Sequence, residues 1–293
     1  METVKDIQQG DELAYRLDLS YIGTRYSGFQ SQSAVATIQD ELEKALKILL
    51  GHAVRIRGAS RTDSGVHAQH QVAVFRTSKP FSRQWLSGLN ALTPGDIGIT
   101  ALAPVPAEFD PIIHSTGKAY RYRLWKGKCF SPFIRPYVWE VSEELCDQQL
   151  AHLGQAFVGL HDFGAFCNRD SDAKSTVREI YGFHVETRGP MTEIWVSGRG
   201  FLKQMIRIMV GTLCEGSRKG WKPEDIQRLL QPGMRREHAG QTAPAKGLCL
   251  VRVFFSEPLP VPGDLIQAAS AGFCQAIPGN HPGCDPFSAE SVL

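Results

Sequence analysis

The chain alternates strand-like and helix-like segments in two successive rounds, and this alternation restricts the fold more than any other feature. Residues 14–21 alternate apolar and polar side chains, as a half-buried strand does. Thr37 can cap a helix with acidic residues in its first turn. The apolar residues of this helix recur at helical spacing, at Ile38, Leu42, Ala45, Leu46 and Leu49.

The same patterns recur along the chain up to residue 255. Further strands are predicted at residues 53–58, 70–76, 97–104, 118–125, 177–187, 192–198 and 247–255. Further helices are predicted at residues 81–92, 143–158, 201–215 and 223–230. We therefore predict an α+β fold with two similar halves, each with mostly antiparallel strands and helices on one face.

Composition changes at both ends of the chain. Residues 1–13 are polar and predict a flexible N-terminal arm, whereas residues 257–293 are rich in Pro, Gly and Ser and predict a tail. A short helix at residues 265–269 is the one element expected within this tail. The two halves are then expected at residues 14–110 and 111–256.

Charge and cysteine content exclude several classes of protein. Lys and Arg number 32 and Asp and Glu number 30, so any basic surface must arise from local clustering. The seven cysteines include no C-x-x-C pair, which favours free thiols in a reducing compartment and no metal site. The chain shows no secretion or import pattern at its start and no apolar window long enough to span a membrane. We expect a cytoplasmic protein without a membrane segment.

The first candidate site is the turn GASRTDSGVH, residues 58–67. Asp63-Ser-Gly is compatible with one half of an aspartic protease site; no second Asp-Ser/Thr-Gly occurs, so such a protease would have to be a symmetric dimer. The triplet is also compatible with an ordinary turn. Arg61 lies two residues from Asp63 and can keep its carboxylate ionised, which favours a nucleophile over an acid.

Two further segments combine cations with apolar residues. In a strand at residues 118–123, Tyr120 and Tyr122 point to one face and Arg121 and Arg123 to the other. Such a strand suits RNA, or it is a half-buried strand with its tyrosines in the core and its arginines in solvent.

The second of these segments is the string at residues 200–211, which opens the helix predicted at residues 201–215; that helix has a core stripe at Phe201, Met205, Ile208 or Met209, and Leu213. Gly200, Lys203, Arg207 and Gly211 share another face of it. Arg207 is either partly buried beside a carboxylate or a solvated arginine on an amphipathic helix.

Other catalytic motifs are missing from the sequence. STGKAY at residues 115–120 lacks the upstream Gly of a phosphate-binding loop, and no G-x-G-x-x-G, G-x-S-x-G or H-E-x-x-H occurs. Ser64 and His67 have no evident third partner, which excludes a serine hydrolase.

Seven strings of the chain, in order, resemble those of the TruA-type tRNA pseudouridine synthases. GASRTDSGVHA at residues 58–68 resembles the catalytic loop of that family, G-R-T-D-A-G-V-H-A. YIGTRYSGFQSQ and TIQDELEKAL precede it, and GKAYRYRL, GLHDFGAF, GFLKQMIRIMVG and APAKGLCL follow. The resemblance covers about residues 14–255.

The resemblance implies a role for individual residues. Asp63 would be the catalytic aspartate, and Arg61 would help to flip out or replace the target base. Tyr120 would pack on the flipped uracil and take part in removing the C5 proton, Arg207 would pair with Asp63, and Leu248 would form an apolar wall. The remaining residues expected to bind the substrate are the cations Lys118, Arg121 and Lys203, with Lys126 and Lys128 nearby.

The resemblance also implies a fold, a substrate and an assembly. The halves would share a central sheet, with the active cleft between them. The substrate would be tRNA at uridines 38, 39 and 40 of the anticodon arm, bound by a homodimer that needs no cofactor and no metal. Asp63 could attack the sugar, attack C6 of the base, or remove a sugar proton.

The chain departs from the family pattern at three positions. Ser64 replaces an Ala, Phe29 replaces a Trp, and Ile112 stands where the family commonly has an Arg. The last departure bears on substrate choice more than on chemistry. A competing hypothesis is an RNA-binding protein of the same fold that has lost catalysis.

Overall fold

The computed structural model describes residues 12–168, 170 and 173–255, and the chain divides into two compact units between Ser115 and Thr116. The predicted N-terminal arm, apart from its last two residues, lies outside the described residues. The same holds for the predicted tail and its short helix at residues 265–269. In the part of the chain that is described, no helix is long and apolar enough to cross a membrane.

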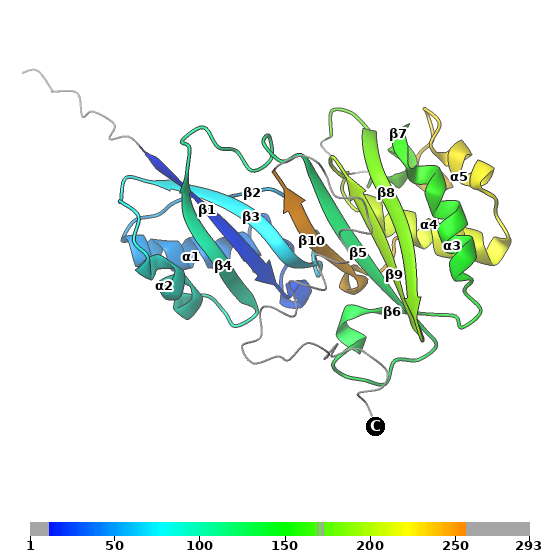
Figure 1. Ribbon diagram of the computed structural model, residues 1–293, viewed down its shortest axis with the longest axis horizontal. Helices are drawn as coiled ribbons and strands as arrows, with labels where there is room; N and C mark the ends of the chain where they lie inside the picture. Colours follow the sequence, from blue (N-terminus) through cyan, green and yellow to red (C-terminus); the bar gives the residue numbers. More distant parts are fainter. Residues whose placement is uncertain (1–11, 169, 171–172, 256–293) are drawn as a thin grey trace, which may run out of the picture. The chain divides into compact units, whose positions relative to one another are not determined.

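The first unit contains an antiparallel sheet in the order β4-β1-β3 (Figure 1). These strands are β1 (Leu13–Tyr21), β3 (His67–Thr77) and β4 (Ile97–Val105), and the two-residue strand β2 (Arg57–Gly58) also pairs with β3. The alternation predicted for β1 is confirmed: Tyr15, Leu17, Leu19 and Tyr21 are buried and the residues between them are half-buried.

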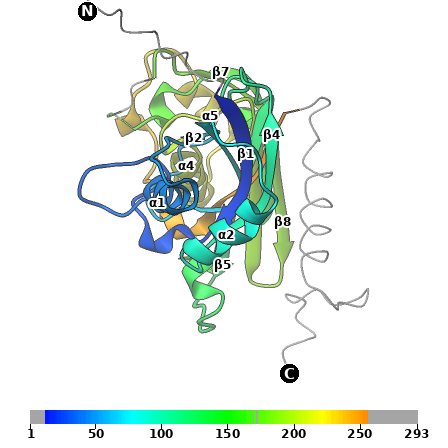
Figure 2. The ribbon, with the colours of Figure 1, turned by 90° about the vertical axis from the view of Figure 1, so that its left-hand side faces the viewer.

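Two helices cover this sheet, α1 (Ile38–Leu50) and α2 (Gln84–Leu92). Figure 2 shows α1 on one side of β1 and β4. The predicted cap of α1 is confirmed, because Thr37 Oγ1 accepts a hydrogen bond from Asp40 N at 3.2 Å. The helix ends at Gly51, whose positive φ of 75° suits glycine.

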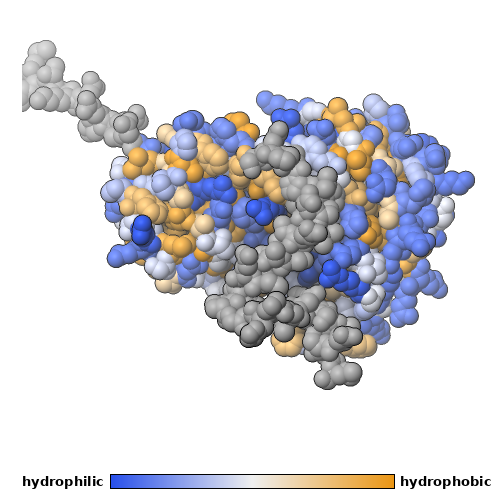
Figure 3. Space-filling view, in the orientation of Figure 1, coloured by the Kyte–Doolittle hydropathy of each residue, from blue (hydrophilic) through white to orange (hydrophobic). Residues whose placement is uncertain are grey.

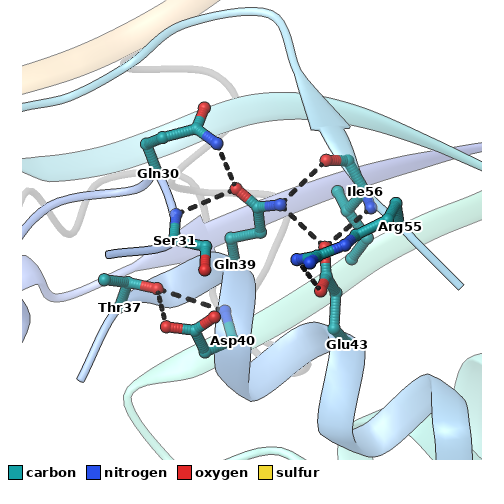
Figure 4. A network of polar contacts seen from close by, with 8 residues as sticks. All are labelled: Gln30, Ser31, Thr37, Gln39, Asp40, Glu43, Arg55 and Ile56. Carbon is teal, nitrogen blue, oxygen red and sulfur yellow. Dashed lines mark hydrogen bonds and ion pairs between the residues drawn. The ribbon is translucent and has the colours of Figure 1, made fainter. Parts of the chain in front are cut away.

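The strand predicted at residues 53–58 is wrong except for its last two residues. Figure 4 shows why: side chains of α1 take up the backbone groups of Ile56. Glu43 Oε1 accepts a hydrogen bond from Ile56 N at 2.9 Å, and Gln39 Nε2 donates one to Ile56 O at 3.2 Å. With these groups already bonded, Ile56 cannot bond to a neighbouring strand.

The second unit contains a sheet in the order β10-β5-β9-β8-β7, in which each neighbouring pair is antiparallel. A further strand, β6, pairs with β5 in parallel. The strands are β5 (Gly117–Lys126), β6 (Trp139–Val141), β7 (Gly159–Asp162), β8 (Val177–Arg188), β9 (Met191–Gly198) and β10 (Leu248–Phe254). The sequence did not predict β6 and β7, which are too short to show an alternation.

The helices of the second unit are α3 (Asp147–Gly154), α4 (Met205–Lys219) and α5 (Pro223–Leu229). The prediction that a helix spans residues 201–215 is wrong at its start, since Gln204 has a φ of 62° and interrupts the helical backbone. The helix predicted at residues 143–158 is also shorter, with a 3₁₀ turn at Gln155–Phe157 after it. The α+β class with mostly antiparallel strands is confirmed.

Candidate functional site

The turn that contains Asp63 is anchored to β3 of its own unit. Ala59 N donates to Val72 O at 2.7 Å. Gln71, which is completely buried, bonds to both backbone groups of Ser60: Ser60 N donates to Gln71 Oε1 at 3.1 Å, and Gln71 Nε2 donates to Ser60 O at 2.7 Å. One side of the turn therefore has a fixed backbone.

The other side of the turn is held by residues 21–29, the first of the family-like strings. Tyr21 Oη and Thr62 Oγ1 lie 2.7 Å apart, and Phe29 N donates to Thr62 O at 3.1 Å. Gly28 has a φ of 97°, and a Cβ at this position would lie 2.7 Å from Thr62 O. This close approach explains the glycine and leaves the turn little freedom to move.

Asp63 is half-buried in this turn, whereas Arg61 is exposed. The interpretation that Arg61 keeps this carboxylate ionised stays a prediction. Ser64 Oγ donates to Tyr26 O at 3.3 Å, and His67 Nδ1 accepts from Gly23 N at 3.1 Å, so this nitrogen serves the backbone.

In the second unit, the paired strands β5 and β10 place Tyr120 and Leu248 on one face of the sheet. Tyr120 lies opposite Leu250, and Tyr122 lies opposite Leu248, so these four side chains share a face. The Tyr120 ring packs edge-on against Phe201, with ring centroids 5.2 Å apart. The structure thus brings together the two residues expected to contact the uracil ring.

Arg121 lies on the opposite face of the sheet from Tyr120. Its guanidinium lies 3.5 Å from Glu193 and 5.3 Å from the centre of the Trp195 ring, and its side chain is only 11% exposed. Burial, together with the charge of Arg123, lowers the pKa of Arg121, and Glu193 opposes this effect. The alternative that places this arginine in solvent is therefore wrong.

Arg207 lies in the first turn of α4, where the segment that leads into β10 fixes it. Arg207 Nε donates to Ala243 O at 2.8 Å, and Ala243 N donates to Arg207 O at 3.0 Å. The next residue, Pro244, accepts a hydrogen bond from Tyr122 Oη at 2.7 Å. A Cβ on Gly211 would lie 1.8 Å from Gln241 O, so only glycine allows this segment to lie so close to the helix.

Lys203 does not share a helical face with Arg207. It is exposed and precedes α4, because the helix begins at Met205. Of the four residues predicted on that face, only Arg207 and Gly211 belong to the helix. Of the predicted core residues, Met205, Ile208, Met209 and Leu213 are buried as expected, whereas Phe201 precedes the helix and is half-buried.

Lys118 is a buried cation on the same face of β5 as Tyr120. It is 9% exposed and lies opposite Gly198 and Val253, and no described carboxylate forms an ion pair with it. Burial lowers its pKa from 10.5 to about 8. An unpaired ammonium in this position costs folding free energy, which indicates a role other than stability.

Lys118→Met is expected to stabilise the protein at pH 7 by about 2 kcal/mol, because a lowered pKa means that burial disfavours the charged form. Between pH 8 and 10, Lys118 is mostly protonated in the unfolded chain and mostly neutral in the folded protein. The wild-type protein therefore gains unfolding free energy as the pH rises, and the stability advantage of the variant shrinks. Urea unfolding at pH 7, 9 and 10 measures both effects. Lys47→Met, at an exposed lysine, is the matched control, and equal shifts in the two variants would contradict the prediction.

Sequence reasoning missed the residues that hold these groups in place. Gln71 and Tyr21 anchor the Asp63 turn, and Ala243 and Pro244 anchor Arg207 and Tyr122. Their only signal was that they lie in or next to the family-like strings. Within the described ranges, no group of three His, Cys, Asp or Glu side chains is arranged to hold a metal ion, and the five described cysteines are free thiols.

Comparison with known proteins gives consistent matches. A family model described as tRNA pseudouridine synthase matches residues 19–111 and 154–256. The tRNA pseudouridine synthase A of Citrifermentans bemidjiense is 41% identical over 243 residues, which cover 83% of this chain and 97% of that protein. The proteins of the same name from Solidesulfovibrio magneticus and Myxococcus xanthus are 42% and 39% identical, over 83% and 86% of this chain and 91% and 97% of theirs. The family model includes the Asp63 turn and the first turn of α4.

Proposed function

This chain belongs to the tRNA pseudouridine synthase family and isomerises uridine to pseudouridine in tRNA, and from this premise we propose that its targets are uridines 38, 39 and 40 of the anticodon stem-loop. We also propose that it works as a homodimer in the cytoplasm. The free thiols of the described cysteines support a reducing compartment.

The observation that supports this proposal best is the Asp63 turn, which is held from both sides. Backbone bonds from Val72 and Phe29 and side-chain bonds from Gln71 and Tyr21 fix the residues next to Asp63. None of these bonds uses the Asp63 carboxylate. A carboxylate held in a fixed position by its surroundings is suited to act as a nucleophile.

The reaction breaks the C1′–N1 bond of uridine, rotates the base, and forms a C1′–C5 bond. The C5 proton leaves to solvent and N1 gains a proton, so the product is an isomer of the substrate. A base in a stem or a stacked loop must first leave the stack, at a cost of a few kcal/mol. In our proposal, Asp63 is the nucleophile on the flipped nucleotide, and exposed Arg61 occupies the gap that the base leaves.

Arg207 is proposed to pair with Asp63, which would keep the carboxylate ionised. Its bond from Nε to Ala243 O orients the guanidinium, and an arginine can bind a carboxylate through two parallel N–H groups. On the Tyr120 face, the Tyr120 ring and Leu248 would contact the flipped uracil, with Tyr120 able to take the C5 proton. The shared face of these two residues supports the assignment.

Lys118, Arg121 and Lys203 are proposed to contact the tRNA backbone. Lys203 is exposed, and Lys118 is unpaired on the Tyr120 face. Arg121 is buried against Glu193, so we expect the smallest change in tRNA affinity from its neutralisation. Lys126 also has a carboxylate partner, Asp147, whereas Lys128 is exposed. Removing an exposed cation that contacts a phosphate should lower the salt dependence of tRNA binding.

Incubation with unmodified tRNA tritiated at uridine C5 tests the proposal. We expect tritium release, with pseudouridine mapped to positions 38–40 of the product. Tritium release with pseudouridine elsewhere would contradict the anticodon-arm target but not the reaction. Binding of tRNA without tritium release would instead favour an RNA-binding protein that has lost catalysis.

A further inference from the structure

The segment between β5 and β6, residues 127–138, exposes two phenylalanine rings. Phe130 is 86% exposed and Phe133 is 85% exposed, the highest values among the large hydrophobic residues of the described chain. Figure 1 shows this segment next to β6, and Figure 3 shows that the drawn face of the second unit is mainly hydrophilic. Two exposed aromatic rings three residues apart on such a surface indicate a binding site.

This segment, residues 127–138, is called the Phe130–Phe133 loop, and hydrogen bonds of its backbone within its own unit hold it in place. Gly127 N donates to Val141 O at 2.9 Å, and Cys129 N donates to Glu140 Oε1 at 2.8 Å. Arg135 N donates to Ser131 O at 2.9 Å, which closes the turn between the two rings. Because the backbone is bonded on both sides of the rings, their exposure follows from the folded structure and not from a frayed end.

The two rings lie between positive charges. Lys128 is exposed and has no ion-pair partner among the described residues, and the Arg135 side chain is 64% exposed, with Glu140 as a distant partner at 3.8 Å. Lys246 Nζ donates to Arg135 O at 3.2 Å and so adds a third cation to the loop. Exposed rings between cations suit single-stranded RNA, because rings stack on bases and cations attract phosphates.

The same loop adjoins the residues that hold Arg207 and Tyr122. Lys246 belongs to the 3₁₀ turn Ala245–Gly247, which packs against the turn Arg135–Tyr137 of the loop. The residue before this turn is Pro244, the acceptor for Tyr122, and the residue after it is Leu248. RNA that reaches Leu248 therefore passes close to the loop.

We propose that Phe130 and Phe133 stack on unpaired bases next to the target nucleotide, while Lys128 and Arg135 face the flanking phosphates. This inference rests on the proposed function, since it requires a tRNA whose target lies beside unpaired bases, as in the anticodon loop. A second copy of the chain is the competing occupant of the two rings. The flanking cations and the tRNA substrate favour RNA.

The test compares two double variants of the full chain, F130L/F133L and F130W/F133W, in tritium release from tRNA. Leucine keeps an apolar side chain but cannot stack, whereas tryptophan stacks well. We expect the Leu variant to raise KM for tRNA about tenfold, and the Trp variant to keep the wild-type KM. At saturating tRNA, kcat should stay within about twofold of wild type in both, because neither ring is proposed to touch the reacting atoms.

Salt dependence separates the rings from the cations. K128Q/R135Q should reduce the slope of log KM against log salt by about one to two, whereas F130L/F133L should leave the slope unchanged. Circular dichroism and urea unfolding establish that each variant is folded, and sedimentation gives the size of each variant.

Two results would overturn the inference. The first is an unchanged KM for F130L/F133L while wild-type enzyme releases tritium, which leaves the proposed function intact. The second is a changed oligomeric state of F130L/F133L with an unchanged KM, which assigns the rings to a second copy of the chain. Failure of the wild-type enzyme to release tritium would instead refute the proposed function.

Discussion

Asp63→Asn is expected to lower pseudouridine formation by at least about 10⁴-fold while tRNA binding stays nearly intact. Asparagine has almost the same shape as aspartate but no charge, so it cannot act as a nucleophile. The turn should keep its conformation, because the bonds that anchor it at Ser60, Thr62 and Val66 do not use this carboxylate. Single-turnover tritium release and filter binding of tRNA measure the two quantities.

Ser64→Ala is the matched control for this variant. Ser64 is the next residue of the same turn, and its hydroxyl makes one bond, to Tyr26 O at 3.3 Å. We expect this variant to retain activity and the wild-type unfolding free energy to within about 1 kcal/mol. Turnover by Asp63→Asn at a rate close to that of Ser64→Ala would refute the catalytic role of Asp63.

Arg207→Lys is expected to lower kcat about 10²- to 10³-fold, although the charge is kept. The arginine uses Nε to bond Ala243 O at 2.8 Å, and its planar terminal group can then bind a carboxylate. Lysine has one nitrogen and cannot do both. The loss should appear in kcat at saturating tRNA more than in KM, because the proposed partner of Arg207 is Asp63 and not the RNA.

Arg218→Lys on the same helix is the control. Arg218 also donates through Nε to a backbone oxygen, Cys214 O at 3.2 Å, but it is exposed and lies near the end of α4. We expect its kcat to stay within about twofold of wild type. Equal losses in the two variants, accompanied by equal losses in unfolding free energy, would assign the effect to α4 and contradict a specific role for Arg207.

Local sequence patterns predicted most of the secondary structure. Thr37 caps α1 as expected, and the period of two in β1 matches its burial. The errors occur where tertiary contacts decide the backbone. Side chains of α1 replace a strand neighbour at Ile56, and the left-handed backbone of Gln204 delays the start of α4. Neither the bonds at Ile56 nor the backbone conformation of Gln204 has a periodic signal in the sequence.

The candidate site shows the same division. The Asp63 turn and the Tyr120 strand could be identified from the sequence because family-like strings surround them. The environment of each cation could not be predicted. Arg121 was compatible with a solvent-exposed cation of a half-buried strand, yet it is buried against Glu193. Lys118 was predicted to contact RNA, and it is buried without an ion-pair partner in the described chain.

The sequence by itself determined the α+β class, the family, and the residue types available for catalysis, since these depend on periodicity and on short strings of adjacent residues. Only the tertiary structure decided which groups hold the candidate catalytic residues in position. Gln71 and Tyr21 immobilise the Asp63 turn, Ala243 orients Arg207, and the Phe130–Phe133 loop lies beside Lys246. The physical reason is that burial and hydrogen-bond geometry depend on neighbours distant in the chain, which no local pattern encodes.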